Sequence, residues 1–523
     1  MPEAHQLGFP EMLGQMLYLD LFPEADVALL GRYRAGGVMV RRRYAKSTRQ
    51  LVRLISRHQE EAVQPLFVGA NFEWGTGNDT PSGTLFPGLM AIAANVNNTA
   101  AGDFAKVTAH EARALGVNHL ISPMLDIVTG QANVELGTRS GGSDPKTVGA
   151  LGRALIEVFQ ANKVMCTAKH FPGAGDRIAT GNPGLPVQKH DKKYILNVCI
   201  KPFKEAIDAG VGCIMVGNMH VPAIMGEKPE AASLSEKIVT GLLREELGYG
   251  GLIITENLAS GTSSLKPVDA CAAAIRAGAD LILTKQELLR PDNFADLVWL
   301  VEKDKSLVKK VEAAYKRISE AKKWLGLFKE TTPVSADEAE KSVGAPEHVK
   351  AAKKAALGAV TVLRDAKRLL PMKPKKGEKV IVVTPRLPEA PLVPTKENWG
   401  HVYKVIKDVH PATTPAYVSF SPTGDEVEKS IRAAARAEHV VVVLSHEAGQ
   451  EIDGSQAALA NAIGQANGRS IAVVLGNPFA VKQLSDKIGT VLLTYSNMPL
   501  SQEAAAEVVL GKAAAKGRLP VTL

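Results

Sequence analysis

The sequence predicts a two-part α/β protein, in which a closed barrel of parallel strands is followed by a smaller three-layer α/β domain. From the start of the chain to about residue 330, short apolar runs alternate with helix-like segments. Repeated strand-then-helix units imply a parallel sheet, and seven or eight of them suggest a closed (β/α)8 TIM-type barrel. Beyond about residue 350, Val/Ile-rich runs separated by Ala-rich segments indicate a second sheet in a sandwich with helices.

Seven apolar runs are the expected barrel strands, and segments such as 147–160 and 236–246 between them carry apolar residues at helical spacing. These strands are residues 37–40, 66–70, 119–121, 165–168, 213–216, 252–255 and 281–284. The second sheet is expected to contain residues 379–384, 418–420, 439–444, 471–475 and 491–495.

The boundary between the two parts is expected near residue 330. A long charged amphipathic helix at 306–327 is followed by a polar, Pro-containing stretch at 331–345. With 523 residues the chain is long enough for two or three domains. We therefore expect three parts in order: a barrel domain at 1–330, a linker at 331–350 and a sandwich domain at 351–523.

Composition and charge favour an ordinary globular protein. Hydrophobic residues make up 45% of the chain and charged residues 22%, which excludes a disordered or fibrous class. The net charge of +8 comes partly from short basic runs such as 41–43 and 373–379. No aromatic residues are interleaved with these runs, so we expect solvated surface and no nucleic-acid partner. Gly-rich phosphate loops are absent, and no cofactor is expected.

The four cysteines are Cys166, Cys199, Cys213 and Cys271, and none forms a CxxC pair. They are expected to be buried free thiols in a reducing compartment, with no disulfide framework and no metal site. The N-terminus lacks the layout of a signal peptide, and no apolar run approaches the ~18 residues of a membrane span. These features predict a cytoplasmic protein without a membrane partner, although a processed chain would look the same.

Polar residues follow several of the expected strands. A Lys169-His170 pair comes directly after the run 165–168 and precedes a Pro-Gly turn. Such a pair can hold a polyhydroxylated or anionic ligand, although a plain strand-to-loop turn fits the spacing equally well. Asn71, Arg139 and Glu256 also follow expected strands. Since the residues just past the strands of a barrel face one pocket, these side chains predict a single site.

The stretch 168–176, AKHFPGAGD, resembles the KHFPGHGD signature of glycoside hydrolase family 3, the family of β-N-acetylhexosaminidases and β-glucosidases. Further matches follow in the family's order over nearly the whole chain. They are GTRS at 137–140, DP at 144–145, Pro186, ASLS at 232–235, GLIITE at 251–256, AGAD at 277–280 and GRLPV at 517–521. The resemblance implies a glycosidase that hydrolyses O-glycosyl bonds of a small carbohydrate substrate.

The resemblance implies Glu256 as the catalytic nucleophile. A retaining glycosidase needs a carboxylate nucleophile and an acid/base, about 5 to 5.5 Å apart when both are carboxyls. The N-acetylglucosaminidases of the family use an Asp where this chain has Glu256. The extra methylene adds roughly 1.5 Å of reach, which slows attack unless the pocket has moved back to suit it.

The usual acid/base of the family's hexosaminidases is missing. They use a His and an Asp partner on the loop after the signature, where this chain reads Thr180-Gly181-Asn182. Asn182 has no titratable proton and is expected to contact substrate instead. Ala174 replaces the His of the signature, and Asn71 replaces an Asp that binds a sugar hydroxyl.

A replacement acid is expected on the second domain, as in the family's glucosidases. The stretch 445–453, SHEAGQEID, loosely resembles their acid-bearing loop. Glu451 is the best-placed residue, Glu447 is next and His446 is a further candidate. Acidic loops after strands are also commonly solvated surface or helix caps, and that alternative stays open.

The sugar-binding positions of the family are largely kept. Arg139, Lys169 and His170 match residues that contact sugar hydroxyls, although a structural salt bridge is the alternative for Arg139. Trp74, with Phe72 beside it, could supply a face for sugar stacking, and a packing role for Trp74 is equally compatible with the sequence.

His220 follows the expected strand 213–216 and could line the pocket, or make a local hydrogen bond.

The leading expectation is a retaining glycosidase that acts on a β-linked N-acetylglucosaminide or glucoside. A catalytically silent sugar-binding protein is the rival, and a different reaction in the same pocket, such as elimination, phosphorolysis or glycosyl transfer, is the third possibility. The sequence leaves the oligomeric state unknown.

Overall fold

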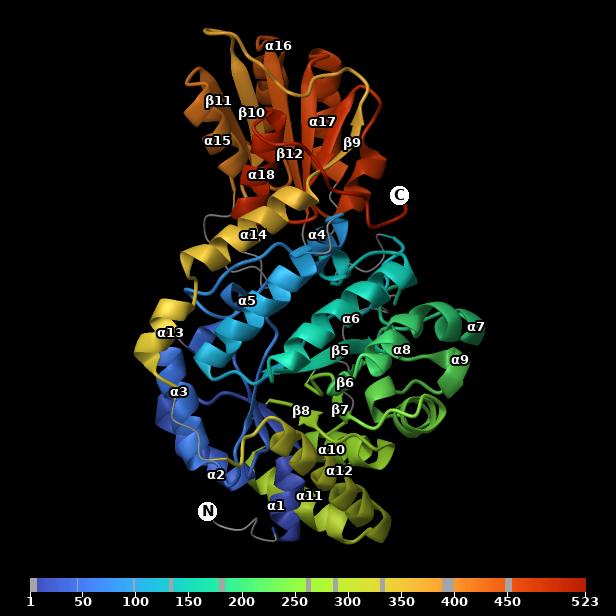
Figure 1. Cartoon of the computed structure of the whole chain (residues 1–523). Coiled ribbons are helices and arrows are strands. Elements are labelled where there is room, and N and C mark those ends of the chain that lie inside the picture. Colours follow the sequence, from blue (N-terminus) through green and yellow to red (C-terminus); the bar gives the residue numbers. More distant parts are fainter. Residues whose placement is uncertain are drawn as a thin grey trace. The chain divides into compact units, whose positions relative to one another are not determined.

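The chain forms two compact units, which are described separately (Figure 1). The first unit comprises residues 1–83, 105–127 and 149–345, and the second comprises 84–104, 128–148 and 346–523. The computed structural model describes residues 7–44, 46–96, 99–130, 135–177, 184–259, 265–285, 290–329, 334–387, 399–446 and 454–523.

The first unit is built on a barrel of eight parallel strands. Its strands are β1 Leu17–Asp20, β2 Gly37–Met39, β3 Phe67–Ala70, β4 His119–Leu120, β5 Met165–Phe171, β6 Cys213–Val216, β7 Leu252–Thr255 and β8 Ile282–Leu283. They are hydrogen-bonded in the order β7-β6-β5-β4-β3-β2-β1-β8, and a parallel bridge between Ile254 and Leu281 joins the two ends. The expected barrel is therefore confirmed.

The barrel strands are short, and every residue in them is buried. Burial on both faces explains why they occur in the sequence as unbroken apolar runs, and all seven expected runs contain a strand. Strand β1 was not predicted, because no turn residue separates it from the apolar residues of the preceding helix α1 (Phe9–Gln15). Strand β5 was expected to end at Ala168, but it continues through Phe171 and includes Lys169 and His170.

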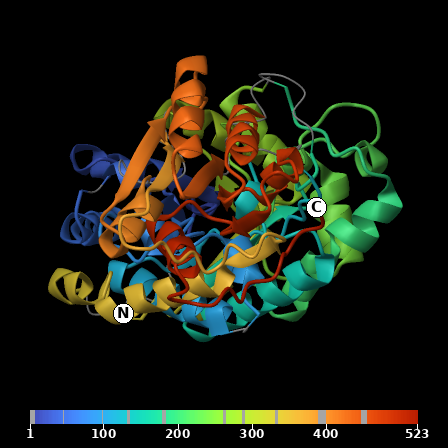
Figure 2. The same ribbon diagram turned by 90° about the horizontal axis from the view of Figure 1, so that it is seen from above.

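Helices connect the strands of the barrel, and in Figure 2 the helices of the blue and the green parts of the chain lie at opposite sides of the view. In chain order the described α-helices before residue 346 are α1, α2 Leu30–Tyr33, α3 Thr48–Glu61, α4 Leu89–Ala94, α5 Thr99–Leu115, α6 Pro145–Ala161, α7 Lys192–Tyr194, α8 Lys201–Asp208, α9 Pro222–Met225, α10 Pro267–Ala277, α11 Pro291–Glu302, α12 Lys305–Trp324 and α13 Ala336–Ser342. The 3-10 helices of this part of the chain are η1 Glu24–Leu29, η2 Arg42–Tyr44, η3 Thr76–Asn78, η4 Gly137–Arg139 and η6 Ala232–Leu234. The π-helices are η5 Ile195–Cys199 and η7 Lys237–Glu246. The helical patterns at 147–160 and 306–327 correspond to α6 and α12, and the pattern at 236–246 is the wide helix η7.

One charged side chain of α12 is buried in the first unit. Lys322 has no exposed surface, and its Nζ donates to Oε1 of Gln15 at 2.6 Å. The amine also lies 5.3 Å from the centre of the Phe67 ring. Burial lowers the pKa of Lys322 to about 7, because a charged amine loses its hydration there.

We expect the stability of the fold to depend on pH through Lys322. Below pH 7 the amine is charged in both the folded and the unfolded chain, and above about pH 10.4 it is neutral in both. Between these values the unfolded chain binds more protons, so the folded chain gains stability as the pH rises. Relative to a Lys322→Met variant, the parent should gain on the order of 3 to 5 kcal/mol between pH 7 and 10, measured from calorimetric unfolding. The exposed Lys323→Met is the matched control, and a pH-independent difference for Lys322→Met would contradict the prediction.

The second unit is a six-stranded sheet covered by helices, as expected. Its strands are β9 Thr361–Asp365, β10 Val380–Pro385, β11 Thr413–Val418, β12 His439–His446, β13 Ser470–Gly476 and β14 Thr490–Leu493. Their order is β11-β10-β12-β13-β14-β9, with β9 antiparallel at one edge. Its further helices are α14 Pro346–Ala359, α15 His401–Val409, α16 Gly424–Ala435, α17 Gly454–Ala466, α18 Pro499–Val509 and the turn η8 Pro478–Gln483.

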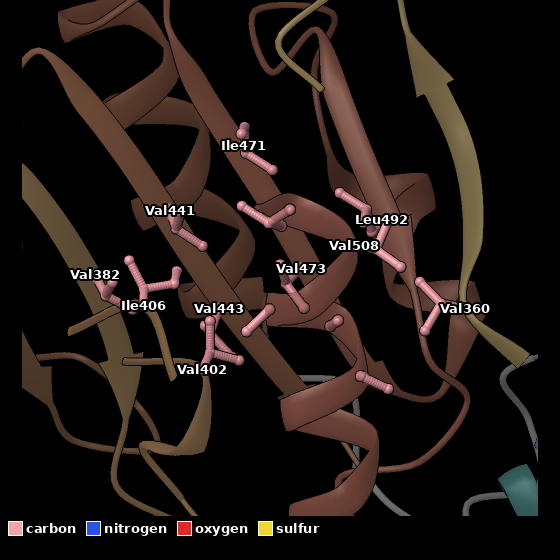
Figure 3. Packing of buried hydrophobic residues seen from close by; sticks show 14 of the residues in the cluster. Val360, Val382, Val402, Ile406, Val441, Val443, Ile471, Val473, Leu492 and Val508 are labelled. Atoms are coloured by element: carbon pink, nitrogen blue, oxygen red, sulfur yellow. The ribbon is translucent and has the colours of Figure 1, made fainter. Parts of the chain in front are cut away.

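Alternate residues of the central strands build one core of this unit. Val441 and Val443 of β12 and Ile471 and Val473 of β13 point to the same side, toward helices α15 and α18 (Figure 3). The residues between them in sequence, such as Val442, are also buried. A sheet buried on both faces is the arrangement of a three-layer sandwich.

The stretch expected to be a linker contains helix α13 and the start of α14.

All four cysteines are buried free thiols, as expected, and burial raises the pKa of Cys213 to about 12. Within the ranges described above, no helix combines the length and the apolar content that crossing a membrane requires.

Candidate active site

The first group of site residues lies where β3 and β5 end. Lys169 and Glu73 are both almost completely buried, and Nζ of the lysine is 2.5 Å from Oε1 of the glutamate. The same Nζ donates to Oδ1 of Asn71 at 3.4 Å. Two of the predicted sugar-binding residues, Lys169 and Asn71, are therefore brought together, although they are 98 residues apart in sequence.

The second group is centred on Asp126, which follows β4 and is completely buried. Its Oδ2 is 2.8 Å from Nδ1 of His170 and accepts the backbone N–H of the same residue at 3.1 Å. Its Oδ1 accepts the backbone N–H of Ala174 at 2.6 Å. Burial alone would raise the pKa of Asp126, but the His170 ring, the Ala174 N–H and the charge of Arg177 together lower it. An ionised carboxylate thus fixes the orientation of the His170 ring.

The third group surrounds Glu256, directly after β7. Its Oε2 accepts the backbone N–H of Asn218 at 2.5 Å and lies 3.9 Å from Nη1 of Arg177. Burial would raise the pKa of Glu256, but the charges of His170 and Arg177 and the Asn218 N–H outweigh it, and the pKa is lowered. The Glu256 side chain is 22% exposed, so an ionised carboxylate remains accessible at a barrel strand end.

Three charged residues of this site were missed by the sequence reasoning: Glu73, Asp126 and Arg177. Each of them had a weak signal. Glu73 is the third residue of the loop that contains Asn71, and Arg177 directly follows the AKHFPGAGD stretch. Asp126 is an acidic residue within an otherwise apolar run after β4. None of these signals indicates which residue each charged side chain contacts, because the contacting residues are far apart in sequence.

The other predicted binding residues that the structure describes differ in burial and in their hydrogen-bond partners. Trp74 is 3% exposed and Phe72 is completely buried, so both pack inside the first unit and present little surface for stacking. His220 is also buried, and its Nδ1 accepts the N–H of Glu230 at 3.5 Å. Arg139 lies on η4, in the second unit, and donates to the carbonyl of Glu135 at 3.3 Å.

Two predicted residues, Asn182 and Glu451, lie outside the described residues, as does Glu447. Among the side chains that the structure does place, no group of three or more His, Cys, Asp or Glu residues could hold a metal ion. The assembled site therefore offers carboxylates, a lysine, an arginine and a histidine. Such groups suit hydrogen bonding to hydroxyls and nucleophilic attack by a carboxylate.

The fold and this cluster define a barrel enzyme whose reactive groups lie at the carboxyl ends of parallel strands. Residues 6–321 match the model of the glycosyl hydrolase family 3 N-terminal domain, and residues 360–523 match that of the family's C-terminal domain. The chain therefore belongs to glycosyl hydrolase family 3, and the family and the similar proteins indicate a glycosidase that hydrolyses O-glycosyl bonds.

Similar proteins carry related names. A β-N-acetylglucosaminidase/β-glucosidase of Cellulomonas fimi is 28% identical over 395 residues, which cover 72% of this chain and 68% of that protein. A β-hexosaminidase A of Pseudoalteromonas piscicida is also 28% identical, with coverage of 68% and 67%. The solved structure of a family 3 β-N-acetylglucosaminidase from Paenibacillus sp. str. FPU-7 superposes with a TM-score of 0.86 at 27% identity and covers 99% of both chains.

Proposed function

We propose that this chain is a retaining glycosidase that removes a β-linked N-acetylglucosaminyl or glucosyl unit, with Glu256 as the nucleophile. The observation that carries the proposal is the Glu256 carboxylate itself. It follows β7 at the end of the barrel that holds Lys169 and His170, it is partly exposed, and its pKa is lowered. A nucleophilic carboxylate must be ionised and must be able to reach the anomeric carbon.

The choice of sugar is supported by the relatives, whose names include β-N-acetylglucosaminidase, β-hexosaminidase and β-glucosidase. In this proposal Lys169, His170 and Asn71 bind hydroxyls of the sugar whose bond is cleaved, through charge-assisted and neutral hydrogen bonds. The Lys169–Glu73 and His170–Asp126 contacts support it, because they hold both side chains at the barrel end. The same binding role stays a prediction for Arg139, His220 and Asn182, whereas the burial of Trp74 favours a packing role for that side chain.

The acid/base is proposed to be Glu451. It cannot be the usual histidine, since Asn182 occupies that place in the sequence. A Glu451→Gln variant should lose at least about 100-fold in kcat/KM on natural glycosides, the scale of removing a general acid. It should lose little on 4-nitrophenyl glycosides, because nitrophenolate leaves without protonation. Comparing both substrates with parent and variant checks this, and equal losses would exclude an acid role for Glu451.

The loss of both the histidine and its acidic partner favours one rival, a catalytically silent protein that keeps the pocket for sugar recognition. A different reaction in the same pocket is the third possibility. Elimination, phosphorolysis and glycosyl transfer each require other proton transfers than hydrolysis does. Phosphate as the acceptor would lessen the need for an acid.

The deciding experiment is release of nitrophenol from 4-nitrophenyl β-N-acetylglucosaminide and β-glucoside, each with and without phosphate. Turnover without phosphate supports the proposed hydrolysis, and the preferred substrate identifies the sugar. Turnover only with phosphate would replace hydrolysis by phosphorolysis. No turnover, together with a raised Tm in the presence of N-acetylglucosamine or glucose, would identify a binding protein.

A further inference from the structure

The carboxylate of Glu256 is held asymmetrically. Both of its close polar contacts, with the Asn218 N–H and with the Arg177 guanidinium, are made by the same oxygen, Oε2. A carboxylate bound through one oxygen keeps the other oxygen directed elsewhere, because the two are fixed in one plane on the same carbon. Oε1 is then the oxygen that can face a substrate.

The Asn218 side of this contact is rigid. The side-chain amide of Asn218 donates to the carbonyl of Asn257 at 2.8 Å, and its Oδ1 accepts the hydroxyl of Ser233 at 2.5 Å. Asn218 and Ser233 are both buried. The residue that follows Glu256 is therefore tied to the same loop that donates to Glu256, so the two cannot move independently.

Gly217 lies beside the carboxylate of Glu256. A Cβ atom at Gly217 would lie 3.6 Å from Oε2 of Glu256 and 3.2 Å from Cβ of His170. It would also approach the Met219 side chain to 2.7 Å, a distance that real Cβ atoms essentially never show. A side chain at position 217 would therefore press on Met219 and His170, which pack beside Glu256, while its contact with Oε2 itself would be ordinary.

Arg177 supplies the charge. It is 8% exposed and follows the turn of the AKHFPGAGD stretch, where its N–H donates to the carbonyl of Ala174 at 3.2 Å. A separation of 3.9 Å from Oε2 is an ion pair without a short hydrogen bond. The guanidinium therefore attracts the carboxylate through its charge, while the Asn218 N–H fixes the direction of Oε2.

We propose that Arg177 is a positioning residue for the nucleophile: together with the Asn218 N–H it holds Oε2 of Glu256 and directs Oε1 toward the anomeric carbon. The arrangement draws the longer Glu side chain toward β6 and so offsets the roughly 1.5 Å of additional reach over an Asp. The inference rests on the proposed role of Glu256 as nucleophile. It assigns to Arg177 a function that acts through Glu256 and not on the sugar.

The alternative is that Arg177 serves only the fold, through its attraction to Asp126. The two roles differ in what they do to the titration of Glu256. An opposite charge within about 4 to 6 Å lowers the pKa of a carboxyl by 1 to 3 units. Loss of the Arg177 charge should therefore raise the pH at which Glu256 becomes ionised, whereas a purely structural loss would reduce activity equally at all pH values.

The test compares the parent with Arg177→Met, Arg177→Lys and the control Arg153→Met, which removes a half-buried arginine paired with Glu205 outside the site. The substrate is the 4-nitrophenyl glycoside that the parent prefers, and kcat/KM is followed from pH 4 to 8. In Arg177→Met the acid limb should move up by at least about one pH unit, and Arg177→Lys should restore most of the shift. Arg153→Met should keep the parent profile. An unmoved acid limb in Arg177→Met would overturn the inference.

A second measurement keeps the test independent of turnover. Tm is measured for Arg177→Met, Glu256→Gln and the double variant at pH 7, where contacting charges give non-additive effects. The double variant should lose less than the sum of the two single losses, and additive losses would overturn the inference. If Glu256→Gln keeps full activity, the proposed function fails. If Glu256→Gln is inactive while the Arg177 variants keep the parent acid limb, only the positioning role fails.

Discussion

Replacing Glu256 by Gln is expected to lower kcat at least about 1,000-fold, which corresponds to about 4 kcal/mol in the activation barrier. The amide keeps the size of the side chain and can remain beside the Asn218 N–H, but it cannot form the glycosyl-enzyme bond. Binding of the free sugar should change only a few-fold, because the residues proposed to contact its hydroxyls are intact. Steady-state kinetics with a nitrophenyl glycoside and calorimetric titration with the free sugar measure the two quantities.

Two further variants show whether this effect belongs to the nucleophile. Glu256→Asp keeps the charge but withdraws the carboxylate by about 1.5 Å, so a pocket adapted to Glu should lose about 10- to 100-fold. The exposed Glu245→Gln should behave like the parent. If Glu256→Gln hydrolyses the substrate as fast as the parent, another group attacks the sugar and the proposed mechanism is wrong.

Replacing Lys169 by Met is expected to destabilise the first unit by about 3 to 5 kcal/mol, because the buried carboxylate of Glu73 loses its countercharge. The effect is large since both side chains are at most 3% exposed and water cannot substitute for the ammonium group. The same variant should also weaken sugar binding. Thermal unfolding and titration with the free sugar separate the two losses.

The double variant Lys169→Met/Glu73→Gln is the matched control. It removes the orphaned charge together with its partner, so most of the lost stability should return. Sugar binding should stay weak, because the proposed hydroxyl ligand is still missing. A double variant as unstable as Lys169→Met would mean that the loss comes from packing of the lysine stem and not from the ion pair.

The sequence predicted the strands that are buried on both faces, with the exception of β1, and it missed or misplaced the two edge strands of the second sheet. The runs at 213–216 and 252–255 coincide with β6 and β7, because interior parallel strands must be apolar along their whole length. Strand β9, Thr361–Asp365, was not predicted, since four of its five residues are only half-buried and it ends in the charged residues Arg364 and Asp365. Strand β11 was expected at 418–420 but spans Thr413–Val418. The sequence did not indicate these residues, because this edge strand contains Pro415 and the exposed Thr414 and so is not an apolar run.

Much of the candidate site could be located from the sequence, because the predicted barrel topology determines where the strand ends lie. Lys169, His170 and Glu256 lie at strand ends, and the topology of a barrel gathers strand ends at one face whatever the sequence between them. The partners of these residues could not be predicted. Which carboxylate pairs with Lys169 or orients His170 depends on loop geometry between segments 44 or more residues apart, which no local pattern contains.

The three hydrogen bonds accepted by Asp126 have a consequence for what His170 can offer a substrate. An ionised carboxylate only accepts hydrogen bonds, so the proton of the neutral imidazole must sit on Nδ1. Nε2 then carries a lone pair and can only accept a hydrogen bond from a sugar hydroxyl. Asp126 therefore determines, through the Nδ1 side of the ring, that His170 accepts a hydrogen bond from the sugar and does not donate one to it.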